Sequence, residues 1–363
     1  MSLISILLPD LRGGGVERIR LVLAHEFARN GYEVEFVLLQ AKGELLDEAN
    51  SSFSVVDLNV HRIRFVPLKL TEYLNFRKPS VLLVAMWPLT SISAISVFLS
   101  RAQVRLIISE HCDLTSQYLN NGFIHKIFRR LSMSISYRLA HSVVCVSKGI
   151  LLGIAKDSLM RASSLELIYN PLTPRNPPSS ISLQVAEKSW KGPAGSRVLT
   201  VGSLKKQKNH VLLLRAFSQL KNINASLLIL GDGPERTHLE LIAHELGVSD
   251  KVEFAGFKKD PSAYFCTADV FVLSSDYEGF GNVILEALGF GLPVVSTDCP
   301  HGPAEILAQG KYGKLVPTND VDLLMSAIES SLKSDRNVAS LIDRAADFNP
   351  ETAARRYLNL MLL

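Results

Sequence analysis

A proline-rich segment divides the sequence, and each half begins with an apolar stretch of strand length followed by a glycine turn. Residues 170–180 contain four prolines, a density that excludes regular structure and is typical of a boundary between domains. The first half opens with residues 3–8 and Gly13-Gly14-Gly15, and the second opens with residues 197–201 and Gly202. Helical stretches then alternate with further strands in both halves. This alternation predicts parallel sheets covered by helices on both faces.

We therefore expect two doubly wound, Rossmann-like α/β domains, at residues 1–175 and 190–345, with the ligand site in the cleft between them. The amphipathic segment 350–363 is expected as a closing helix that packs on the first domain. Further strands are expected at 32–39, 80–86, 104–109 and 142–147 in the first half, and at 226–230, 252–255, 270–273 and 292–296 in the second.

The targeting and membrane signals of the sequence are weak. The N-terminus lacks the basic region and the cleavage site of a signal peptide. Residues 81–100 approach the length of a membrane span, but Trp87-Pro88 interrupts them, so a strand, a proline turn and a helix explain the segment better. We expect a cytoplasmic protein that is soluble or attached to a membrane only at its surface.

Composition excludes several classes of function. The four cysteines are scattered without metal-ligand spacing, which favours reduced packing residues. No D-x-D pair suited to a divalent ion is evident, and we expect neither a metal nor another cofactor. The formal net charge of +4 is too small to indicate nucleic acid as a partner.

The segment from Glu278 to Glu286 carries the clearest chemical signal. It follows a strand, so it is expected at the carboxyl edge of the sheet, where open α/β sheets bind ligands. Gly279 and Gly281 allow backbone N–H groups to approach a ligand closely. The helix expected from Asn282 would direct its positive dipole end toward a diphosphate. The two glutamates could flank such a ligand.

This segment resembles the E-x7-E signature of retaining glycosyltransferase family four, whose members have the two-domain B-type fold. The resemblance covers nearly the whole chain, because other segments match in order and spacing: Gly14-Gly15, residues 202–209, residues 231–235 and residues 299–306. Rossmann dehydrogenases are disfavoured, since Gly13-Gly14-Gly15 does not give the G-x-G-x-x-G spacing.

The resemblance implies roles for individual residues. Glu286 would accept hydrogen bonds from the ribose hydroxyls, and Glu278 would contact the donor sugar. Lys208 would neutralise charge on the departing diphosphate. The remaining donor-binding residues would be Gly14, Gly15, Gly202, Ser203, Lys205, Gly233, Phe280, Gly281, Asn282 and Val283.

One position departs from the family pattern. The family usually has an arginine directly after the glycine of the phosphate-binding turn, and this chain has Ser203. Lys205 or Lys206 could supply the second charge, although lysine lacks the bidentate fork of arginine. Two solvated lysines on a turn are the plain alternative.

The acceptor side is predicted from the first domain. His111 follows the strand at 104–109 and resembles the family's active-site histidine, and Glu110 could orient its ring. Residues 123–137 form an amphipathic pattern in a stretch without acidic residues, and Lys126, Arg129 and Arg130 would bind an anionic membrane or a phosphorylated acceptor. A surface helix with a solvated basic face is an equally common reading.

The leading interpretation is a retaining, metal-independent transferase. It would move a hexose or an N-acetylhexosamine from a UDP-sugar to a lipid-linked oligosaccharide, such as a polyprenyl-diphosphate glycan, or to a surface polysaccharide. It would work at the inner face of the cytoplasmic membrane. Two alternatives stay open: a non-hydrolysing UDP-sugar epimerase of the same architecture, and a catalytically silent relative that serves as a partner protein.

Overall fold

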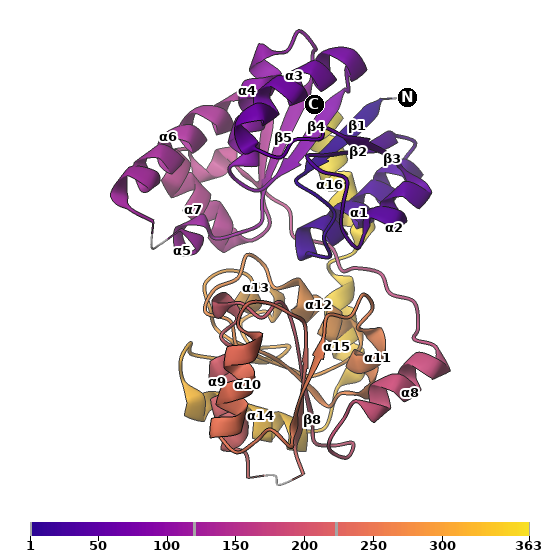
Figure 1. Ribbon diagram of the computed structural model, residues 1–363, viewed down its shortest axis with the longest axis vertical. Coiled ribbons are helices and arrows are strands. Elements are labelled where there is room, and N and C mark those ends of the chain that lie inside the picture. Colours follow the sequence, from indigo (N-terminus) through magenta and orange to yellow (C-terminus); the bar gives the residue numbers. More distant parts are fainter. Residues whose placement is uncertain (1, 119–120, 222–223, 363) are drawn as a thin grey trace. The chain divides into compact units, whose positions relative to one another are not determined.

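The computed structural model describes residues 2–118, 121–221 and 224–362 and divides into two compact α/β units (Figure 1). The first unit comprises Met1–Thr173 and Asn349–Leu363, and the second comprises Pro174–Phe348. Each unit contains one parallel sheet with helices on both faces, which confirms the predicted fold class.

The first unit has a seven-stranded parallel sheet in the order β3-β2-β1-β4-β5-β6-β7. All six residues of β1 are buried, as expected for a parallel strand covered on both faces. The strands are β1 (Leu3–Leu8), β2 (Glu33–Leu38), β3 (Ser54–Asp57), β4 (Val81–Ala85), β5 (Arg105–Glu110), β6 (Ser142–Cys145) and β7 (Glu166–Leu167).

Helices cover both faces of this sheet. Helix α1 buries Ile19, Leu23 and Phe27, which share one side at helical spacing, and α1 packs against the C-terminal helix α16. On the other face α3 packs against α4, and α4 against α6 (Figure 1). The helices are α1 (Gly15–Arg29), α2 (Leu46–Ser52), α3 (Val66–Arg77), α4 (Leu89–Leu99), α5 (Leu114–Gln117), α6 (Phe123–Leu139), α7 (Lys148–Ser158) and α16 (Pro350–Leu362).

The second unit has a six-stranded parallel sheet in the order β10-β9-β8-β11-β12-β13. Chain order reverses between β8 and β11, where doubly wound sheets bind nucleotides. The strands are β8 (Arg197–Val201), β9 (Ser226–Leu230), β10 (Val252–Gly256), β11 (Val270–Leu273), β12 (Val294–Thr297) and β13 (Lys314–Val316). The helices are α8 (Ser180–Lys188), α9 (His210–Ser218), α10 (Arg236–Glu245), α11 (Ser262–Thr267), α12 (Asn282–Gly289), α13 (Pro303–Ile306), α14 (Val321–Lys333) and α15 (Val338–Ala346).

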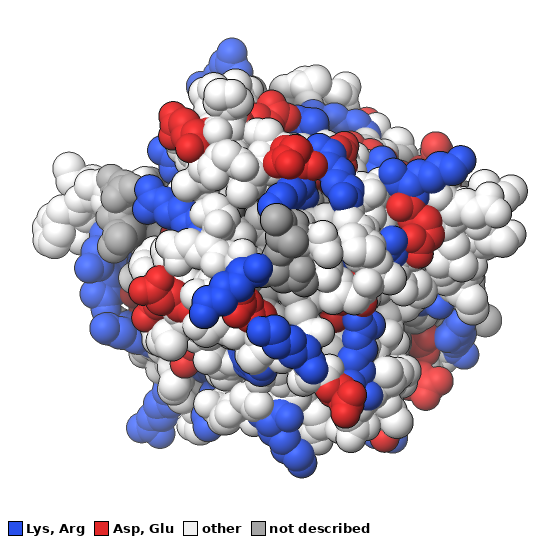
Figure 2. All heavy atoms as spheres, turned by 90° about the horizontal axis from the view of Figure 1, so that it is seen from below, with Lys and Arg blue, Asp and Glu red and all other residues white. Residues whose placement is uncertain are grey.

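The segment of near-span length is confirmed as the strand β4, a turn at Trp87-Pro88 and the helix α4. Within the described part of the chain, no helix combines the length and the apolar character needed to cross a membrane. The face drawn in Figure 2 carries Lys and Arg side chains interspersed with Asp and Glu, as befits the small net charge of +4.

Candidate active site

The loop between β11 and α12 brings Glu278 to the carboxyl edge of the second sheet. Gly281 caps α12 with a φ of 95°, a left-handed conformation that glycine adopts without strain. Gly302 lies so close to this loop that an added Cβ would stand 1.9 Å from the carbonyl oxygen of Phe280. Phe280 itself is buried. The backbone of the loop is therefore held between a buried ring and a second glycine turn.

Glu278 and Lys208 form an ion pair in this loop. The Lys208 Nζ lies 2.6 Å from Glu278 Oε1, and the Ser275 hydroxyl donates to the same oxygen at 2.6 Å. Ser274 donates to the carbonyl oxygen of Lys208 at 2.9 Å and fixes the short 3-10 turn Lys206–Lys208 that follows β8. Two residues 70 positions apart, both expected at the reacting centre, are thus brought together.

The N-terminal half of α12 presents three of the expected donor-binding residues on one side. Asn282, Val283 and Glu286 are half-buried, whereas Ile284 and Leu285 are packed in the core. Glu286 accepts a hydrogen bond of 2.9 Å from Arg175, a residue that sequence reasoning did not connect with the site.

The glycine turns beside the donor loop support one another. Gly202 donates to the carbonyl of Leu230 at 2.9 Å, and a Cβ on Gly233 would stand 2.5 Å from the carbonyl oxygen of Leu204. The close packing of the two turns is thus sufficient to explain why position 233 is a glycine. Ser203 is half-buried, and Lys205 is exposed, so neither position duplicates the contact that Lys208 makes with Glu278.

A D-x-D triplet does occur, at Asp320-Val321-Asp322, and it has a structural use. The Asp320 side chain accepts from the backbone N–H of Leu323 at 2.9 Å and caps α14. Asp322 lies in the first turn of that helix, where a negative charge suits the helix dipole.

In the first unit, His111 is buried against Arg20. Arg20 Nη2 lies 3.1 Å from His111 Nε2, and the Ser109 hydroxyl lies 3.1 Å from the same nitrogen. Burial first, and then the charge of Arg20, hold the pKa of His111 well below its ordinary value. Because Arg20 is always a donor, His111 Nε2 acts as the acceptor, and the proton of the neutral ring resides on Nδ1.

This arrangement corrects the expected role of Glu110. Its carboxylate accepts hydrogen bonds from Tyr137, from Thr90 at 3.1 Å and from the backbone N–H of Trp87 at 3.4 Å. The ring of His111 is oriented instead by Arg20 and Ser109. Burial raises the pKa of Glu110 to about 7, although its hydrogen bonds oppose the shift.

A pocket of about 400 Å³ opens at the carboxyl edge of the first sheet. It is lined by residues that follow β1, β2, β4 and β5, among them Arg12, Gln40, Trp87 and Glu110. Arg12 is held by Asp10 at 2.7 Å, so the pocket combines fixed charges with aromatic and aliphatic walls. Gly14 is the exposed N-cap of α1, and Gly15 is its first residue, close in sequence to this edge.

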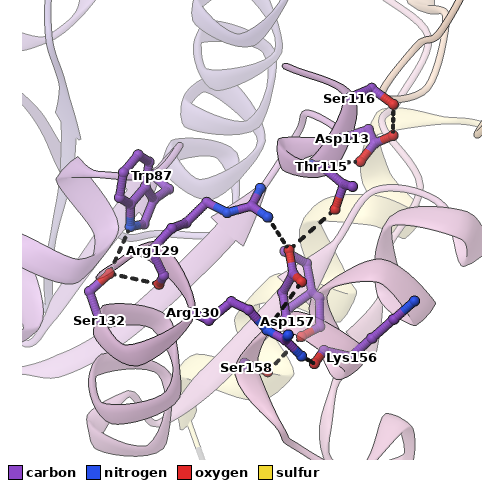
Figure 3. A network of polar contacts seen from close by, with 11 residues as sticks. Trp87, Asp113, Thr115, Ser116, Arg129, Arg130, Ser132, Lys156, Asp157 and Ser158 are labelled. Carbon is purple, nitrogen blue, oxygen red and sulfur yellow. Dashed lines mark hydrogen bonds and ion pairs between the residues drawn. The ribbon is translucent and has the colours of Figure 1, made fainter. Parts of the chain in front are cut away.

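The three basic residues of α6 that were expected to bind a membrane or an acceptor lie in three different environments. Arg129 points into the protein, with its side chain only 3% exposed, and lies 2.7 Å from Asp157 of α7 (Figure 3). Arg130 lies 3.7 Å from the same carboxylate and donates to the carbonyl of Lys156. Lys126 is exposed. The expectation that Arg129 faces a membrane or an acceptor is therefore wrong, because a buried carboxylate on the neighbouring helix requires its charge.

The opposite side of α6 exposes apolar side chains. Ile124 is 84% exposed and Phe128 63% exposed. The exposed apolar face of α6 consists of Phe123, Ile124, Ile127, Phe128, Leu131, Ile135 and Leu139. These positions recur at helical spacing, so they form one continuous stripe.

Two doubly wound units, with an ion-paired glutamate and glycine turns at the carboxyl edge of the second sheet, define the B-type class of glycosyltransferases. Family models agree with this assignment. The model described as "Glycosyltransferase Family 4" matches residues 13–175, and the model described as "Glycosyl transferases group 1" matches residues 187–348. The chain is therefore a glycosyltransferase built of a family-four domain followed by a group 1 glycosyl transferase domain.

Known relatives of similar length are bacterial enzymes of glycan assembly. One, from Campylobacter jejuni, is named N-acetylgalactosamine-N,N'-diacetylbacillosaminyl-diphospho-undecaprenol 4-alpha-N-acetylgalactosaminyltransferase. It is 26% identical over 351 residues, covering 93% of this chain and 92% of the relative. The amylovoran biosynthesis glycosyltransferase AmsD of Erwinia amylovora is 25% identical, covering 96% of both chains.

Solved structures share the fold. Anabaena HepE, solved in complex with UDP-glucose, superposes with a TM-score of 0.82 at 18% identity, and all of both chains is covered. The lipopolysaccharide outer core galactosyltransferase WaaB superposes with a TM-score of 0.74 at 17% identity, covering 100% of this chain and 99% of WaaB.

Proposed function

We propose that this protein is a retaining, metal-independent hexosyltransferase that uses a UDP-sugar donor. The observation that carries the proposal is the pair formed by Lys208 and Glu278 at 2.6 Å, beside the first turn of α12. The pair supports the proposal because it joins a cation and a carboxylate shortly before the start of α12, whose first backbone N–H groups could bind a diphosphate. The donor's diphosphate would draw Lys208 toward the departing oxygen, and Glu278 would then be free to accept sugar hydroxyls.

The proposed acceptor is a glycan carried on a polyprenyl diphosphate or a growing surface polysaccharide, and the transferred sugar is a hexose or an N-acetylhexosamine. Support comes from the name of the Campylobacter relative, which acts on an undecaprenyl-diphosphate glycan, and from the pocket at the first sheet. Trp87 offers that pocket an aromatic wall, and Arg12 offers a cation for an anionic group.

Nucleotide release from a panel of UDP- and GDP-sugars tests the donor. Purified full-length protein is assayed with each donor in the presence of EDTA, and the matched variants Glu278→Gln and Lys205→Ala are run beside it. We expect release from UDP-sugars that Glu278→Gln abolishes and Lys205→Ala leaves within a few-fold. Release from GDP-sugars alone would contradict the proposed donor, and a requirement for added Mg²⁺ or Mn²⁺ would contradict metal independence.

Retention is tested on the product. The anomeric coupling constant of the new linkage, measured by NMR, should show the α configuration of the donor carried into the product. A β linkage formed from an α donor would refute a retaining mechanism. A UDP-sugar whose ring hydroxyl inverts without transfer would instead support the epimerase reading.

We further propose that the exposed apolar face of α6 docks on the anionic inner face of the cytoplasmic membrane. Helix α4, which packs against α6, adds the exposed apolar residues Ile95, Phe98 and Leu99. Exposed apolar surface of this extent on a protein marks an interaction site. Lys126 and the partly exposed Arg130 flank it with positive charge, which suits anionic headgroups.

Vesicle sedimentation tests this docking. Vesicles of phosphatidylglycerol and phosphatidylcholine are mixed with wild type, Ile124→Asp, Phe128→Asp and the control Leu241→Asp. The control changes an apolar residue on α10 whose exposure is close to that of Phe128. Either α6 variant should lose most of the bound fraction, because a fully buried apolar side chain contributes about 1.5–3 kcal/mol. Equal binding by wild type and both α6 variants would refute the proposed face.

A further inference from the structure

Arg175 joins the proline-rich segment at the start of the second unit to the last glutamate of the E-x7-E signature. Its Nη2 lies 2.9 Å from Glu286 Oε2, and its Nη1 lies 3.7 Å from Asp260 Oδ1. The side chains of Arg175 and Glu286 are only 13% and 11% exposed. The contact spans 111 positions of sequence within one unit.

The contact leaves Glu286 with hydrogen-bonding capacity. A carboxylate offers about four lone-pair sites on its two oxygens. Arg175 takes one site on Oε2, and Oε1 receives no hydrogen bond from the described residues. Two vicinal hydroxyls can therefore donate to Glu286 while Arg175 stays bound to it.

The guanidinium is also incompletely used. Arg175 Nε is buried and has no hydrogen-bond partner among the described residues. A buried N–H group without a partner costs about 1–3 kcal/mol. This N–H group is therefore available to donate to an acceptor on a ligand bound beside Glu286.

The charge of Arg175 should strengthen the binding of an anionic nucleotide near Glu286. A nucleoside diphosphate brings negative charge toward α12, where an unpaired Glu286 would repel it. Arg175 neutralises that carboxylate, and its planar fork fixes the carboxylate orientation, as a lysine would not.

We propose that Arg175 is a positioning residue for the donor nucleotide: it holds Glu286 neutralised and oriented so that this carboxylate binds the ribose hydroxyls. The inference rests on the proposed function, since it assigns a further residue to the same donor site. The opposite arrangement, in which Arg175 blocks Glu286 and must leave before the nucleotide binds, would give an effect of the opposite sign when Arg175 is removed.

Isothermal titration calorimetry with UDP tests the proposal without any need for an acceptor. The proteins are full-length wild type, Arg175→Gln, Arg175→Lys, Glu286→Gln, the double variant Arg175→Gln/Glu286→Gln, and Arg215→Gln. The last removes one exposed positive charge from α9 of the same unit and serves as the matched control. Thermal unfolding without nucleotide shows that each variant folds.

We expect Arg175→Gln to weaken UDP binding about 10-fold, the effect of one charge-assisted hydrogen bond. Arg175→Lys should recover part of that loss, and Arg215→Gln should match wild type. The double variant should bind no more weakly than Glu286→Gln. The loss caused by Arg175→Gln should also shrink when 2′-deoxy-UDP replaces UDP, a readout that general destabilisation would not move.

Other results overturn the inference. Tighter UDP binding by Arg175→Gln would show that Arg175 blocks the site. An equal further loss in the Glu286→Gln background would show that Arg175 does not act through Glu286. Unchanged affinity in Arg175→Gln with weakened Glu286→Gln refutes this inference alone, whereas wild type that binds neither UDP nor GDP refutes the proposed function with it.

Discussion

Replacing Glu110 by glutamine should change how the stability of the first unit depends on pH. Glu110 is fully buried at the end of β5, and its carboxylate accepts hydrogen bonds from Tyr137, Thr90 and the backbone of Trp87. Burial raises its pKa from an ordinary value of 4.5 to about 7. The folded protein therefore binds the Glu110 proton more tightly than the unfolded chain does.

The sign and the size of the effect follow from linkage. The stability contributed by the protonated group is fully present below pH 4.5 and is lost as the pH rises through 7. One pKa unit corresponds to about 1.4 kcal/mol, so the whole effect is roughly 3 kcal/mol. Glutamine stays neutral at every pH but offers one oxygen acceptor fewer, which costs about 1 kcal/mol without any dependence on pH.

Urea unfolding at pH 5 and pH 8 measures the difference. The chain has two tryptophans, so a Trp190→Phe background leaves Trp87, in the first unit beside Glu110, as the fluorescent reporter. We expect Glu110→Gln to be about as stable as its parent at pH 5, where the lost acceptor and the partly lost proton linkage nearly cancel, and more stable by roughly 2 kcal/mol at pH 8. The control Glu72→Gln, at an exposed position of α3, should shift neither value.

The reasoning fails if the free-energy difference between Glu110→Gln and its parent is the same at the two pH values. Titration of all other groups is common to the two proteins and cancels in that comparison. A constant difference would mean that Glu110 is charged across this range in the folded protein, and burial would then not govern its proton affinity.

Three further outcomes are expected. Lys208→Ala should lower turnover about 100- to 1,000-fold, the usual effect of removing one transition-state donor, whereas Lys205→Ala should change turnover by no more than a few-fold. Steady-state kinetics with any active donor measures both variants, and an equal loss of turnover in the two would contradict this expectation. Arg129→Met should destabilise the first unit by about 3–5 kcal/mol, because it leaves Asp157 as a poorly compensated buried charge. In thermal melts, Arg129→Met/Asp157→Leu should regain much of the lost stability. A much smaller loss of stability in Arg129→Met would argue against burial of the pair. Dialysis against EDTA should leave turnover unchanged, and recovery of lost activity by Mg²⁺ would contradict this expectation.

Much of the architecture was accessible from the sequence because parallel strands and the helices between them have local signals. The fully buried run at residues 3–8 and the glycine turns at Gly202 and Gly281 mark where strands end and ligand-facing loops begin. The short strand β3 and the terminal strands β7 and β13 escaped prediction. Their runs of two to four residues are too brief for alternation or apolar content to stand out.

Helix α6 shows where pattern reasoning stops. Spacing tells which residues share a side of a helix, and Arg129, Met133, Ser136 and Tyr137 do share one. Which side turns inward depends on what the neighbouring helix offers. Here α7 offers Asp157, so a charged residue is buried and the apolar stripe remains outside. No property of residues 123–139 alone determines that outcome.

The same limit applies to the two signature glutamates, and it changes what they can do. Their spacing indicated carboxylates beside a nucleotide, yet each already has a cation, Lys208 for Glu278 and Arg175 for Glu286. Both cations come from segments far away in the sequence, beyond the reach of any local pattern. Under the proposed function, a negatively charged donor would approach two neutralised pairs rather than two bare carboxylates, and its diphosphate would compete with Glu278 for Lys208. If both pairs shape the site in this way, the signature glutamates bind hydroxyls only because their charge is balanced by partners outside the signature.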